Sequence, residues 1–193
     1  MFLGQRHYNQ LKFIVMKRLL FILPLVLCIV ISCQDKAAKA ELEKLKSRKE
    51  LEEQNKELAR KMMDAWTRND IEALKEIFAP NYVFYYPSGN TNTISRSDVF
   101  KMRGMLQSGF PDLDFNMEDL YAEDDIVIFR FIQTGTHQGE YMGIPATGKK
   151  INGSGILISR VKKGKIIEQW EEFNSLGVMQ QLGMELKMEE ENL

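Results

Sequence analysis

The residues best suited to proton transfer lie in the C-terminal third of the chain. His137 occurs in the sequence Gly135-Thr136-His137-Gln138-Gly139 and is the only histidine after residue 33. An imidazole titrates near neutral pH, so His137 can act as an acid or a base. A metal site built from several histidines is excluded there. The alternative role for His137 is structural, as a hydrogen-bonding residue that fixes the glycine-rich loop.

A second candidate set lies on the last predicted strand, residues 166–173. Glu168, Trp170, Glu172 and Asn174 alternate along it and share one face. If this face lines a pocket, Glu172 or Glu168 can supply a base, because a carboxylate in a dry pocket has a raised pKa. In the alternative arrangement, Trp170 packs in the core and both glutamates lie on a solvated rim.

Two arginines are also candidates for contact with a ligand. Arg160, on the predicted strand 151–161, can reach the same pocket across the ladder of strands. Arg130 interrupts an apolar strand and therefore needs a partner, either an acid such as Glu168 or an anionic or carbonyl ligand. Further candidates for the pocket lining are aromatic: Tyr85, Tyr141 and Trp66.

The predicted elements that carry these residues are helices first and strands later. Apolar residues at spacings of three and four predict helices over 58–68, 71–78 and 95–108. Ala79-Pro80-Asn81 predicts a stop. Strands are predicted at 82–87, 113–121, 126–136, 151–161 and 166–173, with a last helix at 176–182. This order predicts an α+β fold with helices packed on one face of an antiparallel sheet.

Three glycine-punctuated segments occur in a characteristic order. They read FPDLDF at 110–115, GTHQGEYMGIPATGKK at 135–150 and GKIIEQWEEFNSLGVMQQLG at 164–183. The set resembles the SnoaL-like ester cyclases, or polyketide cyclases, of the nuclear-transport-factor-2-like superfamily, over roughly 54–183. The resemblance implies a cone-shaped, curved mixed sheet whose concave face is covered by N-terminal helices. It also implies an enclosed pocket for a small, partly apolar carbonyl ligand, with no cofactor and no metal.

Polyketide cyclases of this family close a ring by an intramolecular aldol reaction, with one aspartate as general acid and base. The family pattern W-x-x-x-D-x-x-G-x-x-x-Q-L-G matches here at Trp170, Gly177 and 181–183, but Asn174 occupies the aspartate position. An amide forms hydrogen bonds and takes up no proton at neutral pH. Two functions therefore stay open. One is a cyclase or isomerase whose base is His137 or Glu172, and the other is a non-catalytic ligand-binding or scaffold protein.

The N-terminal segment predicts export. Met16-Lys17-Arg18 precedes a 13-residue apolar run, 19–31, as in a secretory signal. The run is too short for a membrane-spanning helix, which needs about 20 residues. Cys33 follows Ser32 as in a bacterial lipobox, so we expect residues 1–33 to be a signal peptide, with translation starting at Met16 and lipid on Cys33. The alternatives are a plain signal peptide or a short membrane anchor.

Charge and cysteine content restrict the possible partners. The chain has 26 basic and 27 acidic residues, and four of the basic residues precede Gln34, so the remainder carries a net charge of −5. This balance argues against nucleic acid and against a polybasic membrane contact. We therefore expect attachment to the cell envelope through the lipid alone. Because Cys28 and Cys33 are the only cysteines, disulfides and cysteine chemistry are excluded after residue 33.

The predicted organisation has three parts after the signal. Residues 34–53 form a charged helical stalk, 54–185 form the SnoaL-like domain, and 186–193 form an acidic tail. Leucines in the stalk are too irregularly spaced for a regular coiled coil. A homodimer formed through this helix stays an alternative.

Overall fold

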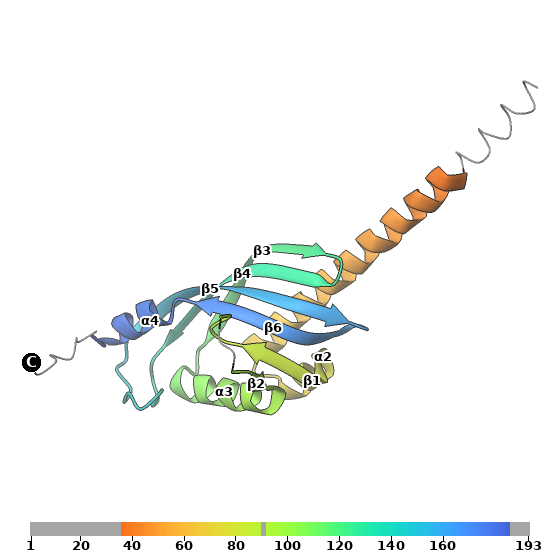
Figure 1. Ribbon diagram of the computed structural model, residues 1–193. Coiled ribbons are helices and arrows are strands. Elements are labelled where there is room, and N and C mark those ends of the chain that lie inside the picture. The colour runs from red at the N-terminus through yellow and green to blue at the C-terminus, as the bar shows by residue number, and fades with distance from the viewer. Residues whose placement is uncertain (1–35, 90–91, 186–193) are drawn as a thin grey trace, which may run out of the picture. The chain divides into compact units, whose positions relative to one another are not determined.

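The computed structural model describes residues 36–89 and 92–185 of the 193-residue chain, in two compact units (Figure 1). The first unit contributes residues 36–49, which are helical and solvent-exposed. The second unit begins at Glu50 and contains the sheet. The predicted signal peptide, Cys33 and the acidic tail lie outside the described residues. Within the described ranges, no helix is both long and apolar enough to cross a membrane.

The helical segment that opens the second unit ends at residue 67 and buries one face. Asn55, Ala59, Met62 and Met63 lie on that face, at the spacing of three to four expected for an amphipathic helix. The Asn55 amide donates a 2.9 Å hydrogen bond to the carbonyl oxygen of Asp124 in a hairpin turn. This bond ties the helix to the sheet.

A buried arginine secures the end of the same helix. Arg103 has no exposed surface, and its Nε donates to the carbonyl oxygen of Trp66 at 2.8 Å. Its Nη2 donates to Gln107 Oε1 at 2.9 Å and to the Thr67 carbonyl at 3.3 Å. A cation at a helix C-terminus satisfies carbonyls that have no intrahelical partner. These bonds fix the backbone at the end of the helix, where Trp66 lies.

Six strands form one curved, mixed sheet in the order β2-β1-β6-β5-β4-β3. All neighbouring pairs are antiparallel except β1 and β6, which are parallel. The strands are β1 (Phe78–Tyr85), β2 (Ile94–Ser95), β3 (Asp114–Glu123), β4 (Ile126–Thr136), β5 (Lys150–Lys162) and β6 (Lys165–Phe173). The predicted α+β fold is confirmed.

Strand β1 starts four residues earlier than the sequence predicted. Phe78 was expected to end a helix and Pro80 to stop it, but both lie in the strand. Phe78 and Tyr82 are buried with their rings stacked at 4.4 Å, while Pro80 is exposed where the register with β6 shifts. Proline is tolerated at such an irregularity because no ladder hydrogen bond is needed from it.

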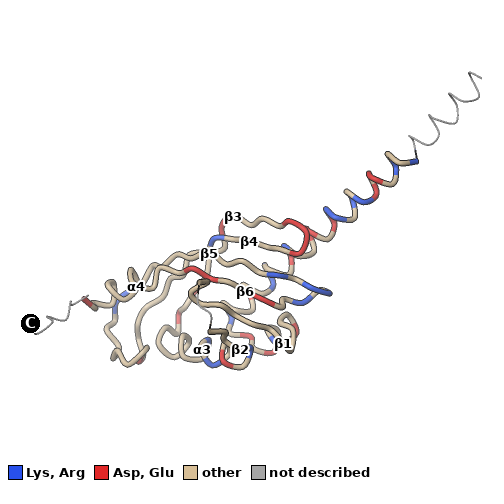
Figure 2. The backbone as a smooth tube through the Cα atoms, viewed as in Figure 1, with Lys and Arg blue, Asp and Glu red and all other residues tan. Residues whose placement is uncertain are grey.

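Three further helices complete the second unit. They are α2 (Ile71–Ile77), α3 (Arg96–Gly109) and α4 (Ser175–Leu182), with Asp70, Ser95 and Asn174 as their N-caps. Figure 1 shows α3 and the helix that ends at residue 67 on one side of the sheet. Charged residues concentrate at the hairpin ends, with acids at 123–125 and lysines at 162, 163 and 165 (Figure 2). Most of the side chains between the helices and the sheet are apolar.

Candidate functional site

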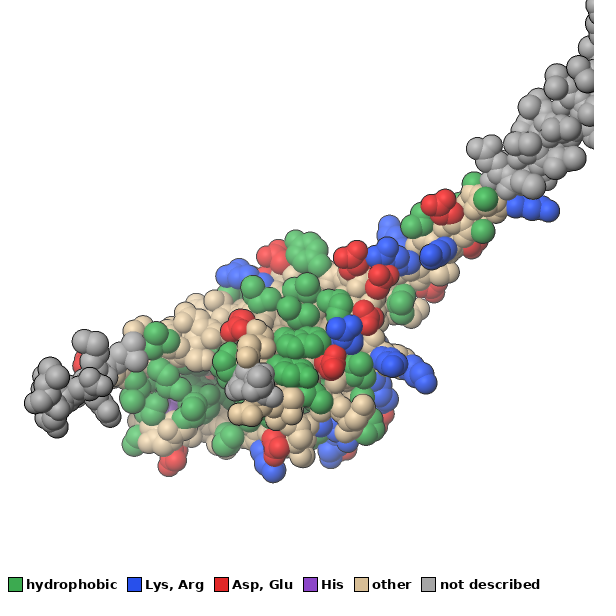
Figure 3. Space-filling model, in the orientation of Figure 1, with side chains coloured by type: hydrophobic (Ala, Val, Ile, Leu, Met, Phe, Trp, Pro, Cys, Tyr) green, Lys and Arg blue, Asp and Glu red, His purple; other side chains and the backbone are tan. Residues whose placement is uncertain are grey.

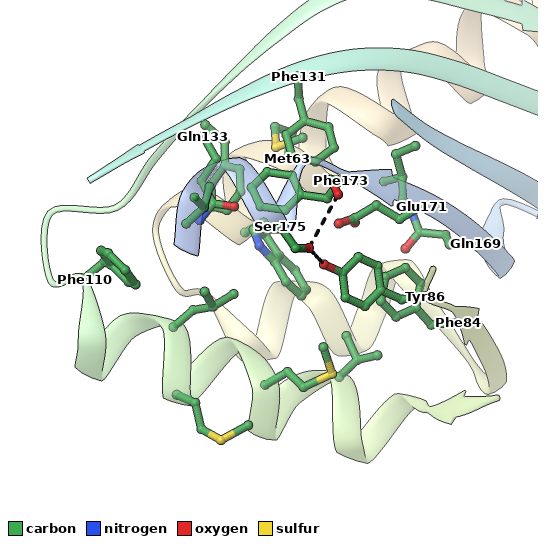
Figure 4. Close-up of a pocket in the computed structure, with 18 of the residues that line it drawn as sticks. Met63, Phe84, Tyr86, Phe110, Phe131, Gln133, Gln169, Glu171, Phe173 and Ser175 are labelled. Carbon is green, nitrogen blue, oxygen red and sulfur yellow. Dashed lines mark hydrogen bonds between the residues drawn. The ribbon is translucent and has the colours of Figure 1, made fainter. Parts of the chain in front are cut away.

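A cavity of about 450 Å³ lies between the helices and the inner face of the sheet (Figure 4). Its walls are mostly aromatic rings and methionines: Trp66, Phe84, Phe110, Phe115, Phe131, Phe173, Met62, Met63, Met102, Met105, Met142 and Met179. A volume of this size suits a ligand of several fused rings. Among the described residues, Glu171 is the only carboxylate in the lining, and no lysine or arginine belongs to it.

Two glycines on β5 make room for the aromatic wall. A Cβ at Gly153 would lie 2.4 Å from Cζ of Phe173, and one at Gly155 would lie 2.6 Å from Cζ of Phe131. The two phenylalanine rings stack in parallel, with centroids 6.0 Å apart. The glycines are therefore required for the shape of the cavity.

Strand β6 supplies the polar part of the cavity. Gln169, Glu171 and Phe173 line it, whereas Trp170 and Glu172 alternate with them and point to the opposite face. The sequence left both orientations of this strand open. The orientation in which Trp170 and Glu172 line the pocket is wrong, because Gln169, Glu171 and Phe173 face inward instead.

Glu171 is an isolated carboxyl group inside the cavity. It forms no hydrogen bond or ion pair with any residue that the structure describes, and protein atoms surround it except where it faces the cavity. Burial raises its pKa from 4.5 to about 8, and the charge of Glu172 adds to the shift. A carboxyl group with this pKa exchanges its proton near physiological pH.

Two hydroxyl groups accompany Glu171. Tyr86 Oη and Ser175 Oγ are hydrogen-bonded, and Ser175 Oγ can donate to the Phe173 carbonyl oxygen at 3.5 Å (Figure 4). Burial raises the pKa of Tyr86, so its phenol stays protonated at neutral pH. When Ser175 donates its proton to Tyr86 instead of to the Phe173 carbonyl oxygen, the Tyr86 O–H is free to donate to a ligand oxygen.

Gln169 has a different role, although it also lines the cavity. Its Oε1 accepts a 2.6 Å hydrogen bond from Tyr82 Oη, and its Nε2 donates to Ser159 Oγ at 2.8 Å. All three side chains are buried. This chain connects β1, β6 and β5 through satisfied partners, so Gln169 is structural.

Four predicted pocket residues lie on the outer face of the sheet, which corrects their expected position. Trp170 stacks on Tyr85 with ring centroids 5.5 Å apart, and Arg160 lies over the Trp170 ring at 5.6 Å. Arg160 Nε donates to Glu168 at 2.9 Å and Arg130 pairs with Glu118. These arginines are balanced by acids at the surface, so neither is left for a ligand.

The three predicted catalytic side chains also lie outside the lining of the cavity. Glu172 accepts a hydrogen bond at 3.0 Å from the Ser88 backbone N–H at the surface. Asn174 caps α4 by accepting from the Gly177 N–H at 3.0 Å. These contacts correct the expected pocket positions of both residues.

His137 is fully buried, but it lies behind Phe110 rather than in the cavity. The two rings stack at 5.1 Å, and Nδ1 of His137 lies 3.0 Å from Thr147 Oγ1. The His137 N–H donates to the Lys149 carbonyl oxygen at 2.8 Å. His137 therefore fixes the loop between β4 and β5, which is the structural alternative given above.

The remaining predicted candidates, Trp66 and Tyr141, line the cavity. Sequence reasoning missed Glu171 and Gln133, which also line it. Glu171 could have been found from the sequence because it is two residues from Phe173 on the same strand, and side chains two residues apart share a face. Within 36–89 and 92–185, no cluster of three or more histidine, cysteine or acidic side chains is placed to hold a metal ion.

Comparison with known proteins agrees with this architecture. The family model described as SnoaL-like polyketide cyclase matches residues 56–182. AclR, a proposed hydroxylase from Streptomyces galilaeus, is 32% identical, with a TM-score of 0.62 over 67% of this chain and 95% of AclR. IdmH, a proposed polyketide cyclase from Streptomyces antibioticus, is 27% identical, with a TM-score of 0.60 over 67% of this chain and 99% of IdmH. No curated protein matches the chain.

A further solved structure supports the fold alone. A proposed SnoaL-like polyketide cyclase from Jannaschia sp. is 21% identical, with a TM-score of 0.63 over 70% of this chain and 96% of its own. Because the family model covers most of the chain, the chain belongs to the SnoaL-like polyketide cyclase family.

Proposed function

We propose that this domain binds a neutral, largely apolar carbonyl compound and that Glu171 removes a proton from the carbon beside the carbonyl group. The observation that supports this role is the isolated carboxyl group of Glu171 in an aromatic cavity, with a pKa raised to about 8 by burial. No other carboxylate among the described residues lines that cavity. Asn174 at the expected aspartate position therefore does not leave the site without a base.

The proton transfer uses two neighbouring groups. The ionised Glu171 takes the α-proton, and the electron pair of the broken C–H bond moves to the carbonyl oxygen as an enolate. The Tyr86 O–H, supported by Ser175, donates a hydrogen bond to that oxygen, where charge develops. Glu171, now protonated, can return the proton to the new product. One group thus serves as base and then as acid.

The fate of the enolate distinguishes the possible reactions. AclR is named as a hydroxylase and IdmH as a polyketide cyclase, so relatives of this chain are assigned different reactions. Attack of the enolate carbon on a second carbonyl group of the same molecule would close a ring, as in an aldol cyclisation. Proton removal is the step for which the Glu171 site is suited.

The test is α-proton exchange on a simple probe. We would incubate the full chain with 2-acetylnaphthalene in D₂O and follow loss of the methyl signal by NMR. Exchange should rise with pH and level off above about 8, since about a tenth of Glu171 is ionised at pH 7. A Glu171→Gln variant should show only the buffer rate. Enzymatic exchange that is independent of pH, or that survives in Glu171→Gln, would refute the proposal.

We also propose that the domain is held at the cell envelope by lipid on Cys33. The basic start at 16–18, the apolar run 19–31 and Ser32 before the cysteine support this. Without lipid, the −5 charge after residue 33 gives no attraction to an anionic membrane. Cys33→Ala should abolish fatty-acid labelling and release the protein from membranes. Labelling that persists in Cys33→Ala would contradict the proposal.

A further inference from the structure

A second polar side chain faces the cavity without a hydrogen-bonding partner in the part of the chain that the structure describes. Gln133 lies on β4, is only 7% exposed and belongs to the lining. Its side-chain amide makes no hydrogen bond with any residue that the structure describes. The nitrogen and oxygen of this amide are not among the fully buried atoms that lack a partner, so they border the space of the cavity, where a ligand can reach them. An amide has two N–H donors and one carbonyl acceptor to offer.

Gln169 shows that this arrangement is not general for buried glutamines of the sheet. It is 3% exposed and also faces the cavity, but Tyr82 and Ser159 engage its carbonyl and its amino group. The two glutamines thus have the same chemistry and nearly the same burial. They differ in that the polar groups of Gln133 remain available to a ligand.

The residues paired with Gln133 on the neighbouring strands offer it no polar side chain. They are Phe115 on β3 and Gly153 on β5. In Figure 4, Gln133 lies on one side of Phe173, while Glu171 and Tyr86 lie on the other. The cavity therefore has two polar ends with aromatic rings between them.

We infer that Gln133 is a specificity-determining residue that hydrogen-bonds an uncharged oxygen of the ligand, at the end remote from the enolisable carbonyl group. The ligand class is a planar apolar body with an oxygen substituent at each end, either a hydroxyl or a carbonyl group. No lysine or arginine among the described residues lines the cavity to balance an anionic substituent. The inference rests on the proposed function only in placing the carbonyl group of the ligand at Glu171.

Two probes that differ by one hydroxyl group test this inference. The full chain is titrated calorimetrically with 2-acetylnaphthalene and with 6-hydroxy-2-acetylnaphthalene. The hydroxyl should improve the dissociation constant of the wild type by roughly three- to tenfold, the range of one net hydrogen bond. Gln133→Leu should abolish this difference between the two probes. Equal wild-type affinities, or no binding of either probe, would overturn the inference.

Thermal stability supplies a test that needs no ligand. Gln133→Leu keeps a similar volume and removes an amide without partners, so its Tm should equal or exceed that of the wild type. Gln169→Leu is the matched variant, and its Tm should fall because Tyr82 and Ser159 lose their partner. An equal fall in both variants would show that Gln133 is structural and would overturn the inference.

A Glu171→Gln variant separates this inference from the proposed function. Binding does not require proton transfer, so the hydroxyl of the second probe should still improve affinity in Glu171→Gln. If proton exchange fails in the wild type while the Gln133-dependent gain persists, the proposed function is wrong and the specificity role stands. If proton exchange occurs in the wild type but the hydroxyl of the second probe does not improve affinity, the proposed function stands and the specificity role of Gln133 is wrong.

Discussion

The two faces of strand β6 place similar side chains in opposite environments. Glu171 on the inner face has no hydrogen-bonding partner among the described residues and a pKa of about 8, whereas Glu172 on the outer face accepts hydrogen bonds from Ser88 at the surface. The two carboxyl groups are adjacent in sequence. Their difference shows that the face of the strand, rather than the residue type, decides which group can move a proton near neutral pH.

The aromatic residues of β6 show the same contrast. Phe173 packs inside against Phe131, while Trp170 lies outside, stacked on Tyr85 and covered by Arg160. Ladder partners extend Trp170 into an outer row across five strands: Tyr121, Ile128, Ile158, Trp170 and Tyr85. Figure 3 shows hydrophobic side chains gathered over this part of the sheet. The presence of an apolar residue on β6 therefore does not show which face of the strand points toward the cavity.

The largest expected effect is on catalysis at the two adjacent glutamates. Glu171→Gln should slow α-proton exchange by about 10²–10⁴-fold, the usual contribution of a general base. Glu172→Gln is the matched variant and should change the rate less than about twofold, because Glu172 lies outside the cavity and interacts with Glu171 only through its charge. A similar loss of exchange rate in both variants would contradict the assignment of Glu171 to the cavity and of Glu172 to the outer face.

Of the two adjacent glutamates, the inner one should make stability depend on pH between 4.5 and about 8. Between pH 4.5 and about 8 the unfolded chain ionises Glu171 while the folded chain keeps it protonated, so the free energy of unfolding falls as pH rises. The fall attributable to Glu171 is on the order of 4 kcal/mol. Below pH 4.5 Glu171 is protonated in both the folded and the unfolded chain, so it no longer changes the free energy of unfolding.

Urea unfolding at pH 5 and pH 8 measures this dependence. Glu171→Gln should remove the fall and be more stable than the wild type at pH 8, while Glu172→Gln should retain it. If the free energy of unfolding changes equally from pH 5 to pH 8 in the wild type and in Glu171→Gln, Glu171 is not desolvated.

A smaller effect is expected from filling the inner face. Gly153→Ala places a Cβ 2.4 Å from Phe173 and 2.8 Å from Val178, so the cavity wall must shift. Overpacking of this kind typically costs about 1–3 kcal/mol. Ile156→Ala on the outer face, where the side chain is half exposed, should cost less than about 1 kcal/mol. Chemical denaturation compares the two, and equal costs would contradict the assignment of the faces.

The smallest effect is expected at Asn174, where the family pattern has an aspartate. Asn174→Ala should destabilise the domain by about 1 kcal/mol because α4 loses its N-cap. Asn174→Asp preserves the cap and should leave both Tm and the rate of proton exchange nearly unchanged. A marked gain of exchange in Asn174→Asp would show that position 174 reaches the ligand.

Sequence reasoning obtained the class of fold because its signals are local. Glycine-rich turns and apolar periodicity depend on neighbouring residues alone. The same reasoning failed at Pro80, where burial of Phe78 and Tyr82 overrode a local breaker signal. It also left the orientation of β6 open, since both of its faces carry a glutamate and an aromatic ring.

What the sequence determined by itself is the family, the order of the elements and the presence of a pocket in an α+β domain. Only the tertiary structure decided which side chains enter that pocket. Parity along β6 is set by its pairing with β1 and β5, where Tyr82 and Ser159 give Gln169 its partners on the inner face. A shift of one residue would expose these groups and bury Trp170 instead. Non-local partners thus determine that the carboxyl group of Glu171, and not that of Glu172, faces the cavity.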